Sequence, residues 1–319
     1  MSKELQLNQP LLAKRFEVLK ILGKGSGSSV FQVRDRDHGG KEVALKVLTS
    51  EASFDGKALE RFRNELEVCR TFKHPNLVEA FELIPLEDTF SFTMEYVNGT
   101  DLSKQLLYNP PAFDEIDRIF NQVLPALAEL HRHGIVHRDI KLENVLVRKD
   151  GLVKLSDLGL LKKLDSEGLT QTGILLGTAQ YLPPEYIKFS NFDIRGDIYA
   201  AGIMLYELLT RKRRLTGMPG MQAIEFLLKT KFVIPKIPDN SVPIKYRSIL
   251  NRSLDPDPER RFQSAEEMRD AFQVAAHKSS RDLKLVGEKI GNPDSPSLLS
   301  RLFYVVVFLL MGILMAYLV

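Results

Sequence analysis

Apolar runs of strand length dominate the first hundred residues. From Phe16, two such runs flank a glycine and serine cluster at residues 23–29, which predicts a strand, a loop and a second strand. Residues 43–48, VALKVL, predict another strand, and further strands are expected up to Met94. The N-terminal part of the chain is therefore predicted to be rich in β-sheet.

Helical periodicity appears further along the chain. Residues 57–72 and 113–133 each place apolar side chains on one helical face, and residues 198–209 are so apolar that they predict a buried helix. Residues 302–319 are eighteen positions without a charge. As a helix they would span roughly 27 Å, close to the ~30 Å of a bilayer's hydrocarbon core. The pattern predicts a mixed α and β region followed by a transmembrane helix.

The strand predicted at residues 43–48 contains one cation, Lys46. A buried lysine needs a partner of opposite charge. On the helix predicted at residues 57–72, Glu65 lies within the apolar face, whereas Glu67 lies on the opposite face. Glu65 is therefore the expected partner of Lys46, and the alternative is a lysine that reaches solvent beside a solvated glutamate.

Polar residues gather around a hairpin predicted at residues 145–155. Asp150 and Gly151 form a strong two-residue turn signal, and counting back from that turn pairs Asn144 with Asp157. Two acids, one cation and one amide would then converge, a combination that suits a hard divalent cation and phosphate. They are Asp139, Lys141, Asn144 and Asp157. An ordinary polar loop is the alternative.

Composition limits the kinds of partner that the protein can be expected to bind and the cellular compartment in which it is expected. The 319 residues are 44% hydrophobic and 27% charged, enough for one large or two modest domains. The net charge is +3 with the 44 cations interspersed among 41 acids, so no nucleic-acid partner is expected. The single cysteine, Cys69, excludes an internal disulfide and suits a reducing compartment. The polar first ten residues do not resemble a secretory signal.

The string HRDIKLENVLVRKDGLVKLSDLG at residues 137–159 resembles the catalytic and metal-binding loops of protein kinases. The family pattern is HRDxKxxN followed by DFG, and Leu158 stands here where the family has phenylalanine. Gly23 and Gly25 resemble the family's phosphate-covering loop, with Ser28 in place of its third glycine. The resemblance extends from about residue 16 to residue 272.

This resemblance implies transfer of the γ-phosphoryl group of ATP to a serine or threonine hydroxyl of a protein. Asp139 would accept the hydroxyl proton, and Lys141, the family's mark of serine/threonine specificity, would steady the phosphoryl group. Asn144 and Asp157 would hold Mg²⁺, with Mn²⁺ as an alternative. The residues implied to bind the nucleotide are Leu22, Gly23, Gly25, Ser28, Val30, Ala44, Lys46, Glu65, Glu95 and Val97.

Later landmarks of the family follow in order. The segment that ends with Gly177-Thr178 and Pro183-Pro184-Glu185 resembles an activation segment, with Pro183 in place of alanine. By the same resemblance, Asp197 would brace the catalytic loop and Arg261 would pair with Glu185. The motifs resemble those of bacterial kinases more than those of eukaryotic ones.

Several charged or polar residues allow two interpretations. Arg138 is implied to pair with a phosphorylated activation segment, where Thr170 and Thr172 are the candidate hydroxyls, although both could be simple loop residues. The basic run at residues 211–214 is expected to be a solvated face, with a docking patch for acidic substrates or lipid head groups as the alternative. His131 and His133 are interpreted as structural or solvent-facing, not as metal ligands.

The resulting fold class is α+β, a two-lobed protein-kinase-like fold with one C-terminal transmembrane helix. Its parts are an N-terminal extension, a kinase domain with its N-lobe and C-lobe, a juxtamembrane linker and the transmembrane helix: residues 1–15, 16–276 (16–97 and 98–276), 277–301 and 302–319. Two other classes compete. A pseudokinase scaffold would usually lack an essential residue, whereas a small-molecule phosphotransferase would not need the segment at residues 177–185.

The C-terminal span predicts a location. Cations on its N-terminal side, at positions 278, 281, 284, 289 and 301, place the kinase on the cytoplasmic face of the plasma (inner) membrane by the positive-inside rule. Anchoring would concentrate the enzyme on a surface and favour phosphorylation between copies in a transient homodimer. The expected partners are thus protein substrates, the membrane and a second copy of the chain.

Overall fold

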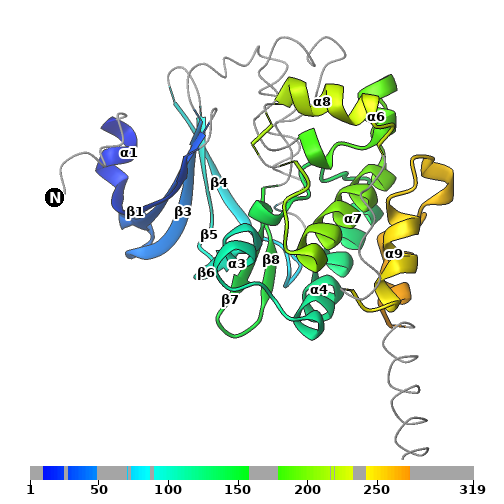
Figure 1. Ribbon diagram of the computed structural model, residues 1–319. Helices are drawn as coiled ribbons and strands as arrows, with labels where there is room; N and C mark the ends of the chain where they lie inside the picture. The colour runs from blue at the N-terminus through cyan, green and yellow to red at the C-terminus, as the bar shows by residue number, and fades with distance from the viewer. Residues whose placement is uncertain are drawn as a thin grey trace, which may run out of the picture. The chain divides into compact units, whose positions relative to one another are not determined.

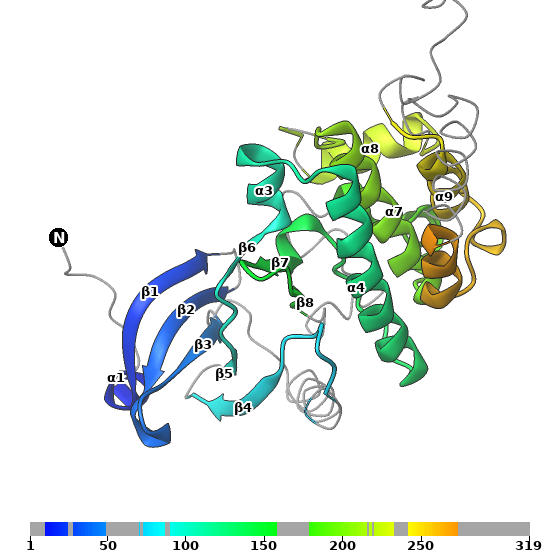
Figure 2. The same ribbon diagram turned by 90° about the horizontal axis from the view of Figure 1, so that it is seen from below.

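The computed structural model describes residues 10–24, 28–48, 70, 73–86, 90–157, 179–215, 217–218, 220–232 and 242–273. The chain divides into two units, Met1–Phe272 and Gln273–Val319. The described residues belong almost entirely to the first unit, in which the strands of a large sheet, with helix α1 beside them, gather apart from the later helices (Figures 1 and 2).

A five-stranded antiparallel sheet occupies the N-terminal part of the first unit, in the order β1-β2-β3-β5-β4. Its strands are β1 (Phe16–Lys24), β2 (Ser28–Asp35), β3 (Lys41–Leu48), β4 (Ala80–Pro85) and β5 (Phe90–Glu95). The prediction of a β-rich N-terminal region is confirmed. The glycines at positions 39 and 40 both have positive φ, which turns the chain from β2 into β3.

A short helix, α1 (Pro10–Arg15), precedes the sheet and packs on it. Leu12 is 1% exposed and joins the sheet's core with Phe16, Val33 and Leu45. Residues 10–15, assigned from the sequence to an N-terminal extension, are thus packed into this lobe. Burial of apolar area is the main reason for the attachment.

The remainder of the first unit is mostly helical. A small sheet of order β6-β7-β8 comes first, formed by β6 (Gly99–Asp101), β7 (Val145–Arg148) and β8 (Val153–Leu155). The helices are α3 (Leu102–Tyr108), α4 (Phe113–Arg132), α6 (Pro184–Phe189), α7 (Ile194–Thr210), α8 (Gly220–Lys229), α9 (Lys245–Ser253) and a helix over residues 265–273. Short 3-10 turns are η1 (Arg36–His38), η2 (Leu142–Asn144), η3 (Ala179–Tyr181) and η4 (Pro258–Arg260).

The two long helices agree with the sequence pattern. α4 has Asp114 and Glu115 in its first turn, where negative charges interact favourably with the positive end of the helix dipole. The chain leaves the helix through Gly134, whose φ of 72° is left-handed. α7 begins at the N-cap Asp193, whose side chain accepts a hydrogen bond from the Arg195 amide. Nearly all of α7 is buried, as its continuous apolar run predicts.

The hairpin of β7 and β8 corrects the predicted register. Val145 pairs with Leu155, so Asn144 lies opposite Ser156 rather than Asp157. The loop has three residues instead of two, because Gly151 adopts φ 84° and the Arg148 amide donates to the Leu152 carbonyl at 2.9 Å. A turn followed by a left-handed glycine adds one residue to a hairpin loop and shifts every pair by one.

Two predicted helices fall almost entirely outside the described residues. The helix predicted at residues 57–72, which includes Glu65, is described only at residue 70, and the transmembrane span at residues 302–319 is not described. In the ranges that the structure does describe, no helix has the length and apolar character required to cross a membrane.

Candidate active site

Asp139 lies at the centre of a compact loop that carries three of the predicted residues. Its carboxylate Oδ2 accepts from Lys141 Nζ at 2.9 Å and from Asn144 Nδ2 at 2.9 Å. Asn144 Nδ2 also donates to the Asp139 carbonyl at 2.8 Å. The η2 turn that ends at Asn144 brings these residues together, and Asp139 is only 8% exposed. The predicted convergence of acid, cation and amide is confirmed.

Asp197, in the first turn of α7, holds the start of this loop. Its two oxygens accept from the backbone amides of His137 at 2.7 Å and Arg138 at 2.8 Å. The second donor has φ 61°, a left-handed conformation that these hydrogen bonds stabilise. The predicted bracing role of Asp197 is therefore confirmed.

Two histidines contribute to the same support. His131 Nε2 lies 2.9 Å from Asp197 Oδ2, which confirms the structural interpretation of His131. Burial lowers the pKa of His137, so its ring is neutral at pH 7. The neutral ring accepts a hydrogen bond at Nδ1 from the Asp139 amide at 3.3 Å.

Lys46 contacts Asp157, a partner that the sequence did not predict. Lys46 Nζ lies 2.5 Å from Asp157 Oδ1, and the two residues are 111 positions apart. The expected partner, Glu65, lies outside the described residues, so the predicted Lys46–Glu65 pair is not tested. Asp157 follows β8 with φ 54°, and the preceding Ser156 amide donates to the Asn144 carbonyl at 2.8 Å. The ladder of this hairpin thus sets Asp157 beside the catalytic loop.

Asn144 and Asp157 fit the coordination of a hard cation. The Nδ2 atom of Asn144 donates its hydrogen bonds to Asp139, so the side-chain oxygen of Asn144 is the atom that could bind a cation. Asp157 contributes a carboxylate, and Mg²⁺ is typically held by one or two such groups together with phosphate oxygens. Within the described ranges, no three His, Cys, Asp or Glu side chains are placed to hold a metal by themselves.

The residues predicted to bind the nucleotide lie along the strands and in the segment that follows β5. In the sheet, Gly23 pairs with Val30 and Ala44 pairs with Met94. The Val97 carbonyl, just after β5, accepts from the Gly99 amide at 2.9 Å. Of the predicted set, those that the structure describes are Leu22, Gly23, Ser28, Val30, Ala44, Lys46, Glu95 and Val97, and Gly25 lies outside the described residues like Glu65.

Lys154 is a residue at this site that sequence reasoning missed. Its Nζ donates to Glu95 Oε2 at 2.8 Å and to the Leu77 carbonyl at 3.2 Å, with its side chain only 10% exposed. The Glu95 carboxylate therefore points to β8. A single cation within the apolar strand β8 was the available signal, the same signal that identified Lys46.

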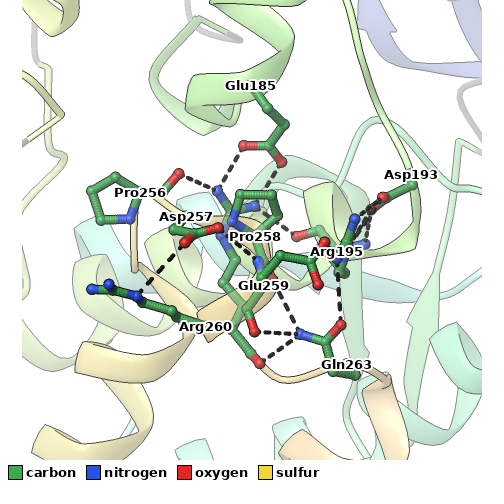
Figure 3. A network of polar contacts seen from close by, with 10 residues as sticks. Glu185, Asp193, Arg195, Pro256, Asp257, Pro258, Glu259, Arg260 and Gln263 are labelled. Carbon is green, nitrogen blue, oxygen red and sulfur yellow. Dashed lines mark hydrogen bonds and ion pairs between the residues drawn. The ribbon is translucent and has the colours of Figure 1, made fainter.

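Glu185 and Arg261 form the buried pair that the resemblance implied. Two parallel hydrogen bonds of 2.7 Å join the guanidinium to the carboxylate, and the Arg261 side chain has no exposed surface. Figure 3 shows Glu185 facing the network that includes Arg195, Glu259 and Gln263. This pair fixes the start of α6, at the end of the segment that resembles an activation segment.

The basic run at residues 211–214 corrects a further prediction. Arg211 and Lys212 are exposed, as expected for a solvated face, but the next two cations turn inward. Arg213 binds Glu143 and Arg214 donates to the Tyr199 hydroxyl at 3.2 Å. The Tyr199 hydroxyl is buried and Glu143 is partly exposed, and the contacts with them turn Arg213 and Arg214 away from solvent, so only half of the run is a solvated face.

Comparison with known proteins agrees with this geometry. The family model for the protein kinase domain matches residues 16–273. A probable serine/threonine-protein kinase, PknB of Lactococcus lactis, is 36% identical over 262 residues, which are 81% of this chain and 41% of that protein. The serine/threonine-protein kinase PrkC of Bacillus subtilis is 32% identical over 83% of this chain and 41% of its own length. The chain thus spans about two fifths of these relatives.

Solved structures show the same fold. The PknI kinase domain of Mycobacterium tuberculosis superposes with a TM-score of 0.61 at 24% identity, covering 82% of this chain and 95% of that one. Rad53 in complex with AMP-PNP gives a TM-score of 0.65 at 24% identity over 81% of this chain and 65% of the other. The two-lobed arrangement, the catalytic loop and the matched family model together establish that the chain belongs to the protein kinase domain family.

Proposed function

We propose that this protein is an ATP-dependent serine/threonine protein kinase. The observation that carries the proposal is the convergence of Asp139, Lys141 and Asn144 in one hydrogen-bonded loop, with Lys46 bound to Asp157 beside it. The names of the bacterial relatives support serine and threonine as acceptors.

Each residue has a role in this reaction. Asp139 accepts the proton of the substrate hydroxyl, and its hydrogen bonds from Lys141 and Asn144 hold it in place for that transfer. Lys141 neutralises charge on the transferring phosphoryl group, and Lys46 orients the other phosphates. Asn144 and Asp157 would hold Mg²⁺, which supplies charge neutralisation at the phosphates when it is bound.

Neither competing class is favoured by the site. A pseudokinase typically lacks one of the residues essential for catalysis. Here the predicted catalytic and metal-binding residues are all present and lie close together: Lys46, Asp139, Lys141, Asn144 and Asp157. A small-molecule phosphotransferase would not need the segment at residues 177–185, whose last residue, Glu185, is held by the buried Arg261.

The test is phosphoryl transfer from γ-labelled ATP with Mg²⁺ to casein, followed by identification of the labelled amino acid. Asp139→Asn and Lys46→Ala should each lower the rate by at least about 100-fold, since positioned proton transfer and phosphate binding are lost. Asp270→Asn, at an exposed site, is the matched control and should retain full activity. A folded Asp139→Asn protein with normal transfer, or label on tyrosine alone, would contradict the proposal.

Control by phosphorylation forms a second part of the proposal. Arg138 Nε is buried and has no hydrogen-bond partner among the described residues. A phosphate on Thr170 or Thr172 would supply charge-assisted hydrogen bonds to this guanidinium and order the segment. Mass spectrometry of active protein should find one of these threonines modified, and the double alanine variant should be less active. Full activity of that variant would remove the switch.

The third part concerns location. The eighteen uncharged residues at 302–319 support a membrane anchor, with cations at positions 278–301 held on the cytoplasmic side. The anchor would concentrate copies of the kinase and favour phosphorylation between them. Full-length protein should therefore require detergent for extraction, whereas a chain ending at Ser297 should be released. Retention of that shorter chain on membranes would overturn the assignment.

A further inference from the structure

Arg213 joins two acidic residues from different parts of the fold. Its Nη2 donates to Glu143 Oε1 at 2.7 Å, and its Nε lies 3.6 Å from Glu207 Oε1. Its guanidinium carbon also lies 5.8 Å from the centre of the Tyr181 ring. A planar guanidinium can donate to two partners in different directions at once, because its N–H groups are held in a rigid fork. The single ammonium group of a lysine, on its flexible chain, holds two partners less rigidly.

The first partner, Glu143, belongs to the catalytic loop. It is the middle residue of the η2 turn, between Leu142 and Asn144. The same turn places Asn144 against Asp139, so any displacement of η2 moves a predicted metal ligand and the predicted base together. Arg213 is thus attached to the element that sets the geometry of the reaction.

The second partner, Glu207, lies near the end of α7 and has no exposed side-chain surface. Its Oε2 accepts from the Tyr181 hydroxyl at 2.5 Å and its Oε1 from the Arg214 amide at 2.8 Å. Burial raises the pKa of Glu207, while Arg213 and Tyr181 favour its charged form. These hydrogen bonds hold the buried Glu207 carboxylate in one position.

Tyr181 completes the connection. It lies in η3, at the end of the segment that separates the catalytic loop from α6, and its hydroxyl is 3.5 Å from the Leu142 amide. Arg213 therefore meets the catalytic loop, the η3 turn and the end of α7 at one place. The left-handed backbone of Arg211, at φ 56°, ends α7 and turns the chain back toward this point.

We propose that Arg213 is a positioning residue for phosphoryl transfer, which acts by holding the η2 turn through Glu143. The inference rests on the roles proposed above for Asp139 and Asn144. In this role Arg213 acts on Glu143 rather than on the reacting groups. Its contribution is to keep η2 tied to the buried Glu207–Tyr181 pair, so that Asp139 and Asn144 keep their separation during turnover.

The test compares full-length wild-type protein with Arg213→Gln, Arg213→Lys and Glu143→Gln in steady-state kinetics. Arg213→Gln should lower kcat about tenfold, because a misplaced catalytic group costs rate even when binding persists, while KM for ATP should change less than about twofold. Arg213→Lys should recover part of the rate, since it restores the charge. Arg211 is an exposed arginine two residues away, so Arg211→Gln is the matched control and should keep the wild-type kcat.

A double-mutant cycle shows whether Arg213 acts through Glu143. If it does, the Arg213→Gln/Glu143→Gln protein should be no slower than the slower single variant, because both changes break one connection. Independent, multiplying losses would overturn the proposal, as would an unchanged kcat with only a lower melting temperature. If Arg213→Gln fails to fold, Glu143→Gln on the more exposed side tests the same bond, and a wild-type kcat there counts against the proposal.

Two controls separate this proposal from the function on which it rests. The wild-type protein must transfer phosphate and Asp139→Asn must not, otherwise the kinase assignment itself has failed. With both satisfied, only the Arg213 results bear on the positioning role. Binding of a fluorescent ATP analogue should be the same for wild type and Arg213→Gln, which confirms that the nucleotide site is intact in the slower variant.

Discussion

At the scale of single residues, the stability lost when an ion pair of this protein is broken depends on how deeply the pair is buried. Arg261 is fully buried against Glu185, whereas Arg195 reaches out to Glu259, whose side chain is 73% exposed. Water screens the second pair and cannot reach the first. Losing one member of a buried pair leaves an uncompensated charge, which is far more costly than losing an exposed one.

This contrast gives a matched pair of substitutions. Glu185→Gln should lower the free energy of unfolding by about 3 kcal/mol, because Arg261 would remain charged and buried. Glu259→Gln in the same network should change it by less than about 1 kcal/mol. Urea denaturation of both variants against wild type measures the difference. Equal effects would mean that burial does not control these two pairs.

At the scale of elements, α1 is attached to the sheet by charge as well as by Leu12. Arg15 Nη2 donates to Asp35 Oδ2 and to Glu82 Oε2, both at 2.7 Å, so one arginine links α1 to β2 and β4. Burial opposes ionisation of Asp35, but hydrogen bonds from Arg15 and His38 outweigh it and hold its pKa below 3.8. The hydrogen bond from Arg15 likewise lowers the pKa of Glu82 below 4.5.

The direction of these shifts predicts an acid dependence. Carboxylates whose pKa is lower in the folded state stabilise the fold above their unfolded pKa values, and this stabilisation is lost as the pH falls through the folded values. Arg15→Gln should therefore destabilise the protein most at pH 7, and the difference from wild type should shrink below about pH 4.5. Chemical denaturation across this range measures it.

Arg34→Gln is the control for that experiment, since the ion pairs of Arg34 with Glu17 and Glu42 are both exposed. Its effect on stability should be small at every pH. An Arg15→Gln effect that stays constant from pH 7 to pH 3 would show that packing of α1, rather than the ionised carboxylates, is what the arginine supports.

At the scale of the whole molecule, the helical core closes at the last described residues. Phe272 is 2% exposed, its ring stacks on Phe120 at 4.9 Å and meets Tyr246 at 6.2 Å. Met268 on the same helix is fully buried. The helix over residues 265–273 is therefore part of the kinase core rather than the beginning of a linker.

Truncation tests this boundary. A chain of residues 1–276 should fold with the melting temperature of the full-length kinase unit and transfer phosphate. A chain of residues 1–264 should not fold, because deleting one buried aromatic side chain alone costs about 3–5 kcal/mol, a large part of a domain's stability. Circular dichroism and activity measurements distinguish the two. A folded, active shorter chain would place the end of the domain before residue 265.

Local pattern was enough to predict much of this protein. The β-rich start, the helices at residues 113–133 and 198–209, and the loop that joins Asp139, Lys141 and Asn144 all follow from residues close together in the chain. Backbone propensity, side-chain periodicity and short-range hydrogen bonding act over such distances. The kinase motifs carry their chemistry in the same local way, so their order and spacing already indicated the reaction.

Tertiary structure decided which partner each charged group has. Lys46 meets Asp157 across 111 positions, Lys154 meets Glu95 across 59, and Arg213 turns inward to Glu143 across 70. The hairpin register also departed from a simple count, because the conformation of Gly151 determines the loop length. Partner choice depends on burial and on which elements pack together, and neither is encoded in any short stretch of sequence.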